Sequence, residues 1–205
     1  MKFKSLTGFV VLLLALTLTY PALAYDKLRA AKNLVSEVEG MIPKNVPEDR
    51  ISIWYSKNGD EPERVLATLY RRVPSGGFIH VAIYSLTHPV IVKALTDAKH
   101  RGVDVRVIVD SGQLRQRNMK VAVSTLEIAG TPVKTNAFHG LMHMKISNVN
   151  REYVTTGSYN YTTSASKYNE ECLYVIPARI DAGGIKKSEE KFLRMWQSVD
   201  YRIVN

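Results

Sequence analysis

The sequence predicts an α/β fold in which a mixed, largely parallel β-sheet is flanked by helices. Residues 78–84 and 103–110 form two nearly continuous apolar runs, which are typical of strands buried on both faces. Between them, Pro89 begins a segment whose apolar residues recur at helical spacing, and Gly102 follows as a C-cap. This strand–helix–strand order predicts a βαβ unit with parallel strands.

Local patterns predict the elements that precede this unit. Residues 25–50 indicate a helix at 28–38 and then a linker that contains glycine and proline. Residues 51–55 alternate weakly and predict the first strand of a single domain that spans 51–205. Pro62 suits the first turn of the next helix. The core-facing residues of that helix recur at helical spacing and are Val65, Leu66, Leu69, Tyr70 and Val73.

The elements after the βαβ unit are also predicted from periodicity and turn residues. A helix is expected near 121–129, and a short strand follows residues 130–134. Residues 143–160 are rich in β-branched residues on both sides of a polar turn and predict a β-hairpin. A strand at 171–176 and a helix at about 188–199 complete the domain.

Composition and charge limit the class of protein. The chain has 205 residues, 45% of them hydrophobic and 23% charged, with no low-complexity tract, which excludes a disordered chain. Its single cysteine, Cys172, cannot form an intrachain disulfide and fits a small buried hydrophobe. The formal net charge of +9 favours polyanionic partners such as nucleic acid or anionic lipid, the alternative being an ordinary basic protein.

The N-terminus has the pattern of a secretory signal peptide. Lys2 and Lys4 precede an apolar run at 9–16, and an Ala-x-Ala cleavage site ends at Ala24. The run is short for a membrane span, which needs about 20 apolar residues. We therefore expect residues 1–24 to direct export to the periplasm or the cell exterior. An uncleaved anchor is the alternative, and it would be the only membrane contact.

Several polar side chains in the predicted hairpin suit the chemistry of a phosphate ester. His143 and Lys145 are two apart and share a face of a strand, which joins a titratable imidazole to a fixed cation. Gly157 permits close approach of the backbone, and Ser158 and Asn160 add hydrogen-bonding groups. A histidine can attack phosphorus while cations and donors neutralise the phosphoryl oxygens.

This division of labour requires no metal. The five histidines and the few nearby carboxylates form no ligand cluster in the sequence, so we expect neither a metal nor another cofactor. A basic cluster of Arg115, Arg117 and Lys120 follows the strand at 103–110, at the end where α/β proteins tend to bind ligands. We consider this cluster a candidate substrate-binding segment, the alternative being a solvated loop.

The hairpin residues have the spacing of the motif HxK(x)4D(x)6GSxN. In this respect the chain resembles the phospholipase D superfamily, and it is similar to the small exported Nuc-type bacterial endonucleases that carry one motif copy per chain. The resemblance extends from about residue 51 to residue 176. It implies that His143 is a nucleophile that forms a phosphohistidine intermediate. It also implies that Lys145 and Asn160 hold the phosphoryl oxygens, with Ser158 nearby.

Two further positions follow from the resemblance. Glu171 matches a downstream glutamate that orients the histidine, and Glu170 is the competing choice. The motif aspartate is replaced by Asn150. Position 150 falls at the predicted turn, where Asp and Asn both bond to nearby backbone, so a structural role would survive the exchange. A role through negative charge would not.

The resemblance also leads to expectations about assembly and substrate. The other four histidines are not followed by x-Lys, so the chain has one motif copy, and a two-fold homodimer would bring two His143 residues to one site. The leading expectation is a metal-independent, nonspecific endonuclease on DNA, with RNA as a further substrate. The alternatives are a phospholipase D-type lipid hydrolase and a catalytically weak nucleic-acid-binding dimer, the latter because of Asn150.

Overall fold

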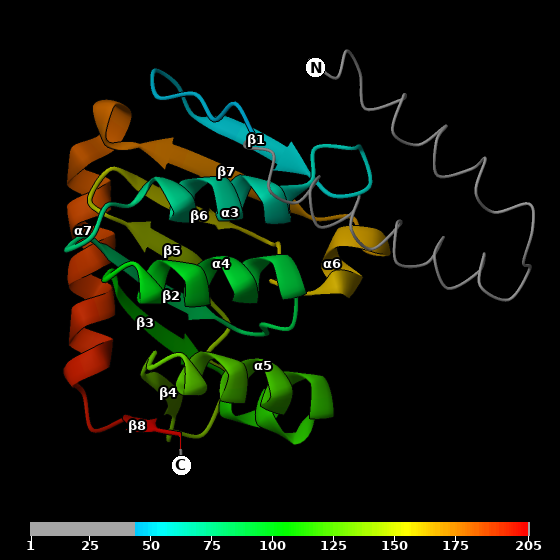
Figure 1. The fold of residues 1–205 in the computed structure, drawn as a ribbon, viewed down its shortest axis with the longest axis vertical. Helices are drawn as coiled ribbons and strands as arrows, with labels where there is room; N and C mark the ends of the chain where they lie inside the picture. The colour runs from blue at the N-terminus through cyan, green and yellow to red at the C-terminus, as the bar shows by residue number, and fades with distance from the viewer. Residues whose placement is uncertain (1–43, 205) are drawn as a thin grey trace, which may run out of the picture. The chain divides into compact units, whose positions relative to one another are not determined.

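The computed structural model describes residues 44–204, in which eight strands form one mixed sheet (Figure 1). The strand order is β1-β7-β6-β5-β2-β3-β4-β8. The strands are β1 (Ser52–Tyr55), β2 (Phe78–Ile83), β3 (Asp104–Val109), β4 (Val133–Asn136), β5 (Lys145–Val149), β6 (Tyr153–Gly157), β7 (Cys172–Pro177) and β8 (Tyr201–Ile203).

The mixed sheet is confirmed, but the expectation that it is largely parallel is wrong. Only β2–β3 and β3–β4 are parallel among the pairings of the described strands, and the other five are antiparallel. The parallel pairs are those joined by crossover helices, as a βαβ connection requires. After β4 the chain returns through loops and the β5–β6 hairpin, which place β5 antiparallel beside β2.

Helices cover both faces of this sheet. In Figure 1, α3, α4 and α5 lie side by side over one face, and α7 runs across their direction at the left. The 3₁₀ helix η1 precedes α5. The helical segments are α3 (Pro62–Arg72), α4 (Pro89–His100), η1 (Ser111–Arg115), α5 (Arg117–Ile128), α6 (Thr163–Lys167) and α7 (Ala178–Gln197).

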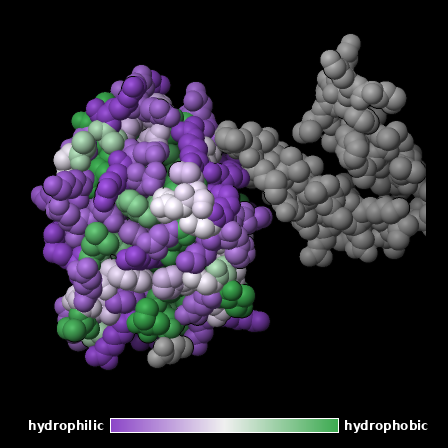
Figure 2. Space-filling model, turned by 60° about the vertical axis from the view of Figure 1, so that its left-hand side comes forward, coloured by the Kyte–Doolittle hydropathy of each residue, from purple (hydrophilic) through white to green (hydrophobic). Residues whose placement is uncertain are grey.

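The two faces of the sheet bury separate hydrophobic clusters. Alternate residues of β2 and β3, such as Val81 and Val107, pack with α3, α4 and α5 in the larger cluster. On the opposite face Ala82 and Ile108 pack with Phe192 of α7. This alternation explains the continuous apolar runs in β2 and β3, because both faces of these strands are covered. Figure 2 brings forward the side that carries α7, where hydrophobic residues form separate groups among hydrophilic ones.

Several elements differ from their predicted extents. α5 begins at Arg117 rather than near residue 121, and α7 begins at Ala178 rather than near 188. Within α7, Asp181 has non-helical torsions and its carboxylate accepts a hydrogen bond from the backbone N–H of Gly184 at 2.7 Å. Two adjacent glycines disfavour a helix in sequence-based reasoning. The short elements α6 and β8 were not predicted.

The predicted signal peptide at 1–24 and the predicted helix at 28–38 lie outside the described residues. Residues 44–50 form neither a helix nor a strand, and they pack against α3 through buried Val46 and an ion pair of 2.7 Å between Lys44 and Glu61. No helix between residues 44 and 204 has the length and apolarity needed to cross a membrane.

Sheet topology brings the two predicted functional regions to one edge. Ile83, the last residue of β2, is paired both with Val109 at the end of β3 and with Lys145 at the start of β5. Because β5 runs antiparallel to β2, the start of the hairpin lies beside the carboxyl ends of the parallel strands. This is the edge at which α/β proteins usually bind ligands.

Candidate active site

His143 and Lys145 meet on the ring of Tyr84, the residue that follows β2. The imidazole lies edge-on to this ring with 4.7 Å between centroids, and the Lys145 Nζ is 5.1 Å from the ring centroid. The Tyr84 N–H donates to the carbonyl oxygen of Met144 at 2.8 Å, which fixes the residue between the two. His143 precedes β5 and is exposed, whereas Lys145 begins the strand and is only 8% exposed.

Lys145 carries its charge in a confined setting. Burial lowers the pKa of its ammonium group, and the negative charge of Glu171 acts in the opposite direction. The ammonium donates a hydrogen bond of 3.1 Å to the carbonyl oxygen of His143. An ammonium has three donors, so this contact leaves capacity for a phosphate oxygen. The geometry therefore supplies a cation beside an exposed imidazole.

The segment after β6 is seated by Gly157. Its φ of 142° is unfavourable for other residues, and an added Cβ would lie 2.2 Å from the carbonyl oxygen of Cys172. The close approach expected at Gly157 is therefore to the neighbouring strand β7. The Ser158 hydroxyl accepts a hydrogen bond of 3.1 Å from the N–H of Cys172, so this side chain also contacts the first residue of β7.

Asn160 is held close to Tyr84 by the next residue. The Tyr161 N–H donates to the carbonyl oxygen of Ser85 at 3.0 Å, and its ring is fully buried. The Tyr161 hydroxyl lies 2.7 Å from the hydroxyl of Ser147, within a buried hydrogen-bonded group. Asn160 Oδ1 is buried and has no hydrogen-bond partner among the described residues. A buried amide oxygen without a partner is unusual in a protein interior.

The two candidate glutamates have different surroundings. Glu170 is exposed and forms an ion pair of 2.7 Å with Lys57. Glu171 is half-buried, and its backbone is fixed on both sides by Ser56. Its carboxylate accepts a hydrogen bond of 3.1 Å from Asn169, and no described contact joins it to His143. Its charge acts on Lys145, which indicates that Glu171 lies nearer to the candidate site than Glu170 does.

A buried carboxylate that the sequence reasoning missed holds the segment before His143. Asp110 follows β3 and is 1% exposed. One of its oxygens accepts from the N–H of Gly112 at 3.0 Å, and the other accepts from the N–H of Met142 at 2.9 Å. Asp110 thus links η1 to the residue immediately before His143. Its place at the carboxyl end of a buried strand was the available signal.

Tyr84 was also missed as a site residue, although it ends a predicted strand. Its hydroxyl accepts a hydrogen bond of 2.7 Å from the Gln113 side chain of η1. The loop that contains the predicted basic cluster is therefore connected to the ring on which His143 and Lys145 meet. Arg115, Arg117 and Lys120 are all exposed, and the last two lie in α5 rather than in a loop.

Asn150 lies away from this group of residues. It is in the turn between β5 and β6, with φ of 50°, and its side chain donates to Glu152 at 2.8 Å. Lys145 is at the other end of β5, which is about 16 Å long at the usual strand rise. Asn and Asp both tolerate this left-handed conformation. The geometry thus favours the structural interpretation of position 150.

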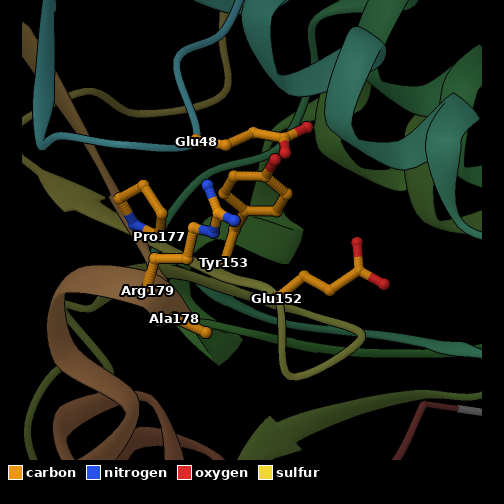
Figure 3. Close-up of a pocket in the computed structure, with 6 residues that line it drawn as sticks. All are labelled: Glu48, Glu152, Tyr153, Pro177, Ala178 and Arg179. Atoms are coloured by element: carbon orange, nitrogen blue, oxygen red, sulfur yellow. The ribbon is translucent and has the colours of Figure 1, made fainter.

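A separate cavity of about 190 Å³ lies beside this same turn (Figure 3). It is lined by Glu48, Glu152, Tyr153, Pro177, Ala178 and Arg179. Burial raises the pKa of Tyr153, and the nearby Glu48 adds to this effect. Figure 3 shows Arg179 alongside the Tyr153 ring, whereas Glu152 points away. The cavity contains none of the predicted catalytic residues.

Comparisons with known proteins agree with the fold and the motif. The family described as cardiolipin synthase, PLD-like domain, matches residues 75–196. A phospholipase D of Rickettsia prowazekii is 32% identical over 120 residues, which are 58% of this chain and 54% of that protein. A mitochondrial cardiolipin hydrolase of Xenopus tropicalis is 29% identical over 137 residues, covering 67% of this chain and 61% of that protein.

Solved structures with a similar fold include two Nuc-type proteins. Nuc from Salmonella typhimurium, a phospholipase D family member, superimposes with a TM-score of 0.69 at 27% identity over 76% of this chain and 98% of Nuc. NucT from Helicobacter pylori shares the fold, with a TM-score of 0.62 at 21% identity over 73% of this chain and 96% of NucT. The chain spans about half the length of the phospholipases D that it matches. The family match covers more than half of the chain, which therefore belongs to the PLD-like domain family of the phospholipase D superfamily.

Proposed function

We propose that this protein hydrolyses phosphodiester bonds without a metal ion and that His143 is the nucleophile. The observation that carries the proposal is the meeting of His143 and Lys145 on the ring of Tyr84. A ring nitrogen of His143 attacks phosphorus, and the bond from phosphorus to the leaving oxygen breaks as that oxygen takes a proton. Water then attacks the phosphohistidine, which releases the phosphate monoester and restores the imidazole.

Lys145 and Asn160 are assigned to the non-bridging oxygens. A charged ammonium in a partly desolvated position stabilises the negative charge that develops in the transition state more strongly than it would in water. In this assignment the amide NH₂ of Asn160 would donate to one of these oxygens. Burial lowers the pKa of Lys145 and the nearby charge of Glu171 opposes this effect, so we assign this glutamate a role through the cation.

The proposed active form is a homodimer in which two sites share one substrate phosphate. The reaction requires a second group that protonates the leaving oxygen from the side opposite His143. Within the chain, His80 is buried against Glu189 at 2.7 Å, and His88 accepts the N-terminal hydrogen bond of α4. A second copy of the chain would supply His143 from its own exposed position.

We propose DNA as the principal substrate, with RNA as a second one. Support comes from the net charge of +9, the exposed cations at the start of α5, and the similarity to Nuc. Nonspecific cleavage fits an anion site built for the phosphodiester alone. We also propose that residues 1–24 direct export.

A phospholipid is the second candidate substrate. It is supported by the relatives, which are named phospholipase D and mitochondrial cardiolipin hydrolase. The third expectation, a binding dimer with little activity, depended on a catalytic role for position 150. The position of Asn150 at the far turn argues against that role.

The test is cleavage of single-stranded and double-stranded DNA by the purified full-length chain in EDTA. We expect cleavage by the wild type and none by His143→Ala. His100→Ala is the matched control, because His100 is exposed at the other end of α4. If the protein does not cleave DNA but hydrolyses cardiolipin in vesicles, its substrate is a phospholipid and the proposal of DNA is wrong.

The dimer is tested with purified heterodimers of differently tagged subunits. One His143→Asn subunit should abolish most activity if both histidines serve one phosphate, whereas half the activity would indicate independent sites. His139 is exposed four residues before His143, so His139→Ala tests whether an acid within the same chain serves instead.

A further inference from the structure

Next to the site, a short loop exposes large apolar side chains. Residues 137–141 connect β4 to the segment that carries His143, and Phe138 and Leu141 are 37% and 60% exposed. The Phe138 ring packs edge-on against Tyr201 of β8, with 5.8 Å between centroids. Phe138 is thus exposed and at the same time in contact with a neighbouring ring, five residues before His143.

This loop is joined to the basic segment by buried polar residues. Asn136 is 4% exposed, and its Oδ1 accepts from the N–H of Ser111 at 2.9 Å while its Nδ2 donates to the carbonyl oxygen of Gly140 at 3.2 Å. Asp110 makes the parallel connection, from η1 to Met142. The two segments therefore form one surface at the edge of the sheet that holds His143.

The basic part of this surface has unbalanced charge. Arg115, Arg117 and Lys120 are exposed, and none of the three forms an ion pair within residues 44–204. No acidic residue occurs between Asp110 and Glu127. Free cations at this position favour a ligand with several negative charges.

We propose that these residues form a platform for single-stranded nucleic acid, in which Phe138 stacks on a base and Arg115, Arg117 and Lys120 bind flanking phosphates. The platform rests on the proposed function, because it delivers the strand to His143. Aromatic rings combined with a cationic track are the usual means of binding single strands without sequence preference. In a duplex the bases are stacked on each other and do not offer a free face to Phe138.

The packing of the loop at 137–141 favours a nucleic-acid strand over a lipid surface. An inserting loop would place its apolar residues in the acyl region and its cations at the headgroups. Here Phe138 is fixed against Tyr201, and only Leu141 is free to insert. The platform therefore fits a flexible polyanion with flat bases better than a membrane.

The test is binding by the full-length His143→Asn protein, which prevents cleavage, to a short oligodeoxythymidylate and to an abasic strand of equal length. Phe138→Ala should weaken binding of oligodeoxythymidylate by about tenfold, the magnitude of one lost stacking contact. It should leave binding of the abasic strand unchanged. Tyr55→Ala is the matched control, because Tyr55 is 45% exposed on β1 at the other end of the strand order.

The cations are tested by salt dependence. Arg117→Gln should lower the slope of log affinity against log salt by about 0.7 for both strands, as expected for one lost phosphate contact. Equal weakening of both strands by Phe138→Ala would overturn the stacking role and leave the proposed cleavage intact. The same two variants are tested on cardiolipin-containing phosphatidylcholine vesicles. If they lose binding to the vesicles but bind oligodeoxythymidylate as the unsubstituted protein does, the platform is also overturned.

Discussion

Replacing Asp110 by alanine tests whether the loop before His143 is positioned from β3. The substitution removes two hydrogen bonds to a buried carboxylate, one from the N–H of Gly112 and one from the N–H of Met142. Hydrogen bonds to a charged group contribute about 1.5–3 kcal/mol each, so we expect the free energy of unfolding to fall by about 3 kcal/mol or more. A displacement of His143 by about 1 Å would reduce kcat about 100-fold.

Asp110→Asn separates the positional effect from the loss of stability. Asparagine keeps one oxygen, which can accept from only one of the two N–H groups, and it presents an NH₂ group to the other. We expect a stability loss of about 1–3 kcal/mol, with a reduction in kcat close to that of alanine.

Urea unfolding and kcat for DNA cleavage are measured on the same preparations, with Asp97→Asn as control. Asp97 pairs with Lys93 on the exposed face of α4, where such a pair contributes about 0.3–0.5 kcal/mol. An Asp110→Asn protein with wild-type kcat would refute the positioning role.

Three further predictions concern the hairpin. Gly157→Ala should lower the free energy of unfolding, measured in urea, by about 3 kcal/mol, because the added Cβ would collide with the carbonyl oxygen of Cys172. Gly76→Ala is the control, since Gly76 also has a positive φ, of 80°, but has open space around it. Burial lowers the pKa of Lys145 from 10.5, so in the window just below pH 10.5 the cleavage rate should fall as this cation deprotonates. In the same window the unfolded chain binds more protons than the folded one, so the free energy of unfolding should rise with pH in urea titrations. A cleavage rate that does not change up to pH 10.5 would argue against a role for this cation. Asn150→Asp should change kcat by no more than about twofold, whereas a tenfold gain would show that the charge matters.

The local elements of the fold could be predicted because each depends on short-range patterns. The apolar runs of β2 and β3, Pro62 and Pro89 at helix starts, and the hairpin turn all correspond to observed elements. The position of β5 could not be predicted, because strand pairing is set by contacts distant in sequence. Its insertion beside β2 makes the sheet mostly antiparallel and brings Lys145 next to Ile83.

The motif residues could be identified from their spacing, but their supports could not. Tyr84, Asp110 and Asn136 are common residue types, and their importance lies in contacts that only the fold creates. Each lies at or just after the carboxyl end of a strand, and this position is the physical signal that such residues share.

The spacing of the motif itself has a structural explanation in the hairpin. Lys145 begins β5, and the four residues that follow it complete the strand and lead to the turn at Asn150. The return strand β6 then ends at Gly157, which brings Ser158 and Asn160 back to the edge where the motif began. Position 150 therefore lies where the chain reverses, and φ of 50° there favours a residue that tolerates the left-handed region. Since asparagine meets this requirement as well as aspartate, the exchange preserves the spacing between the two halves of the site.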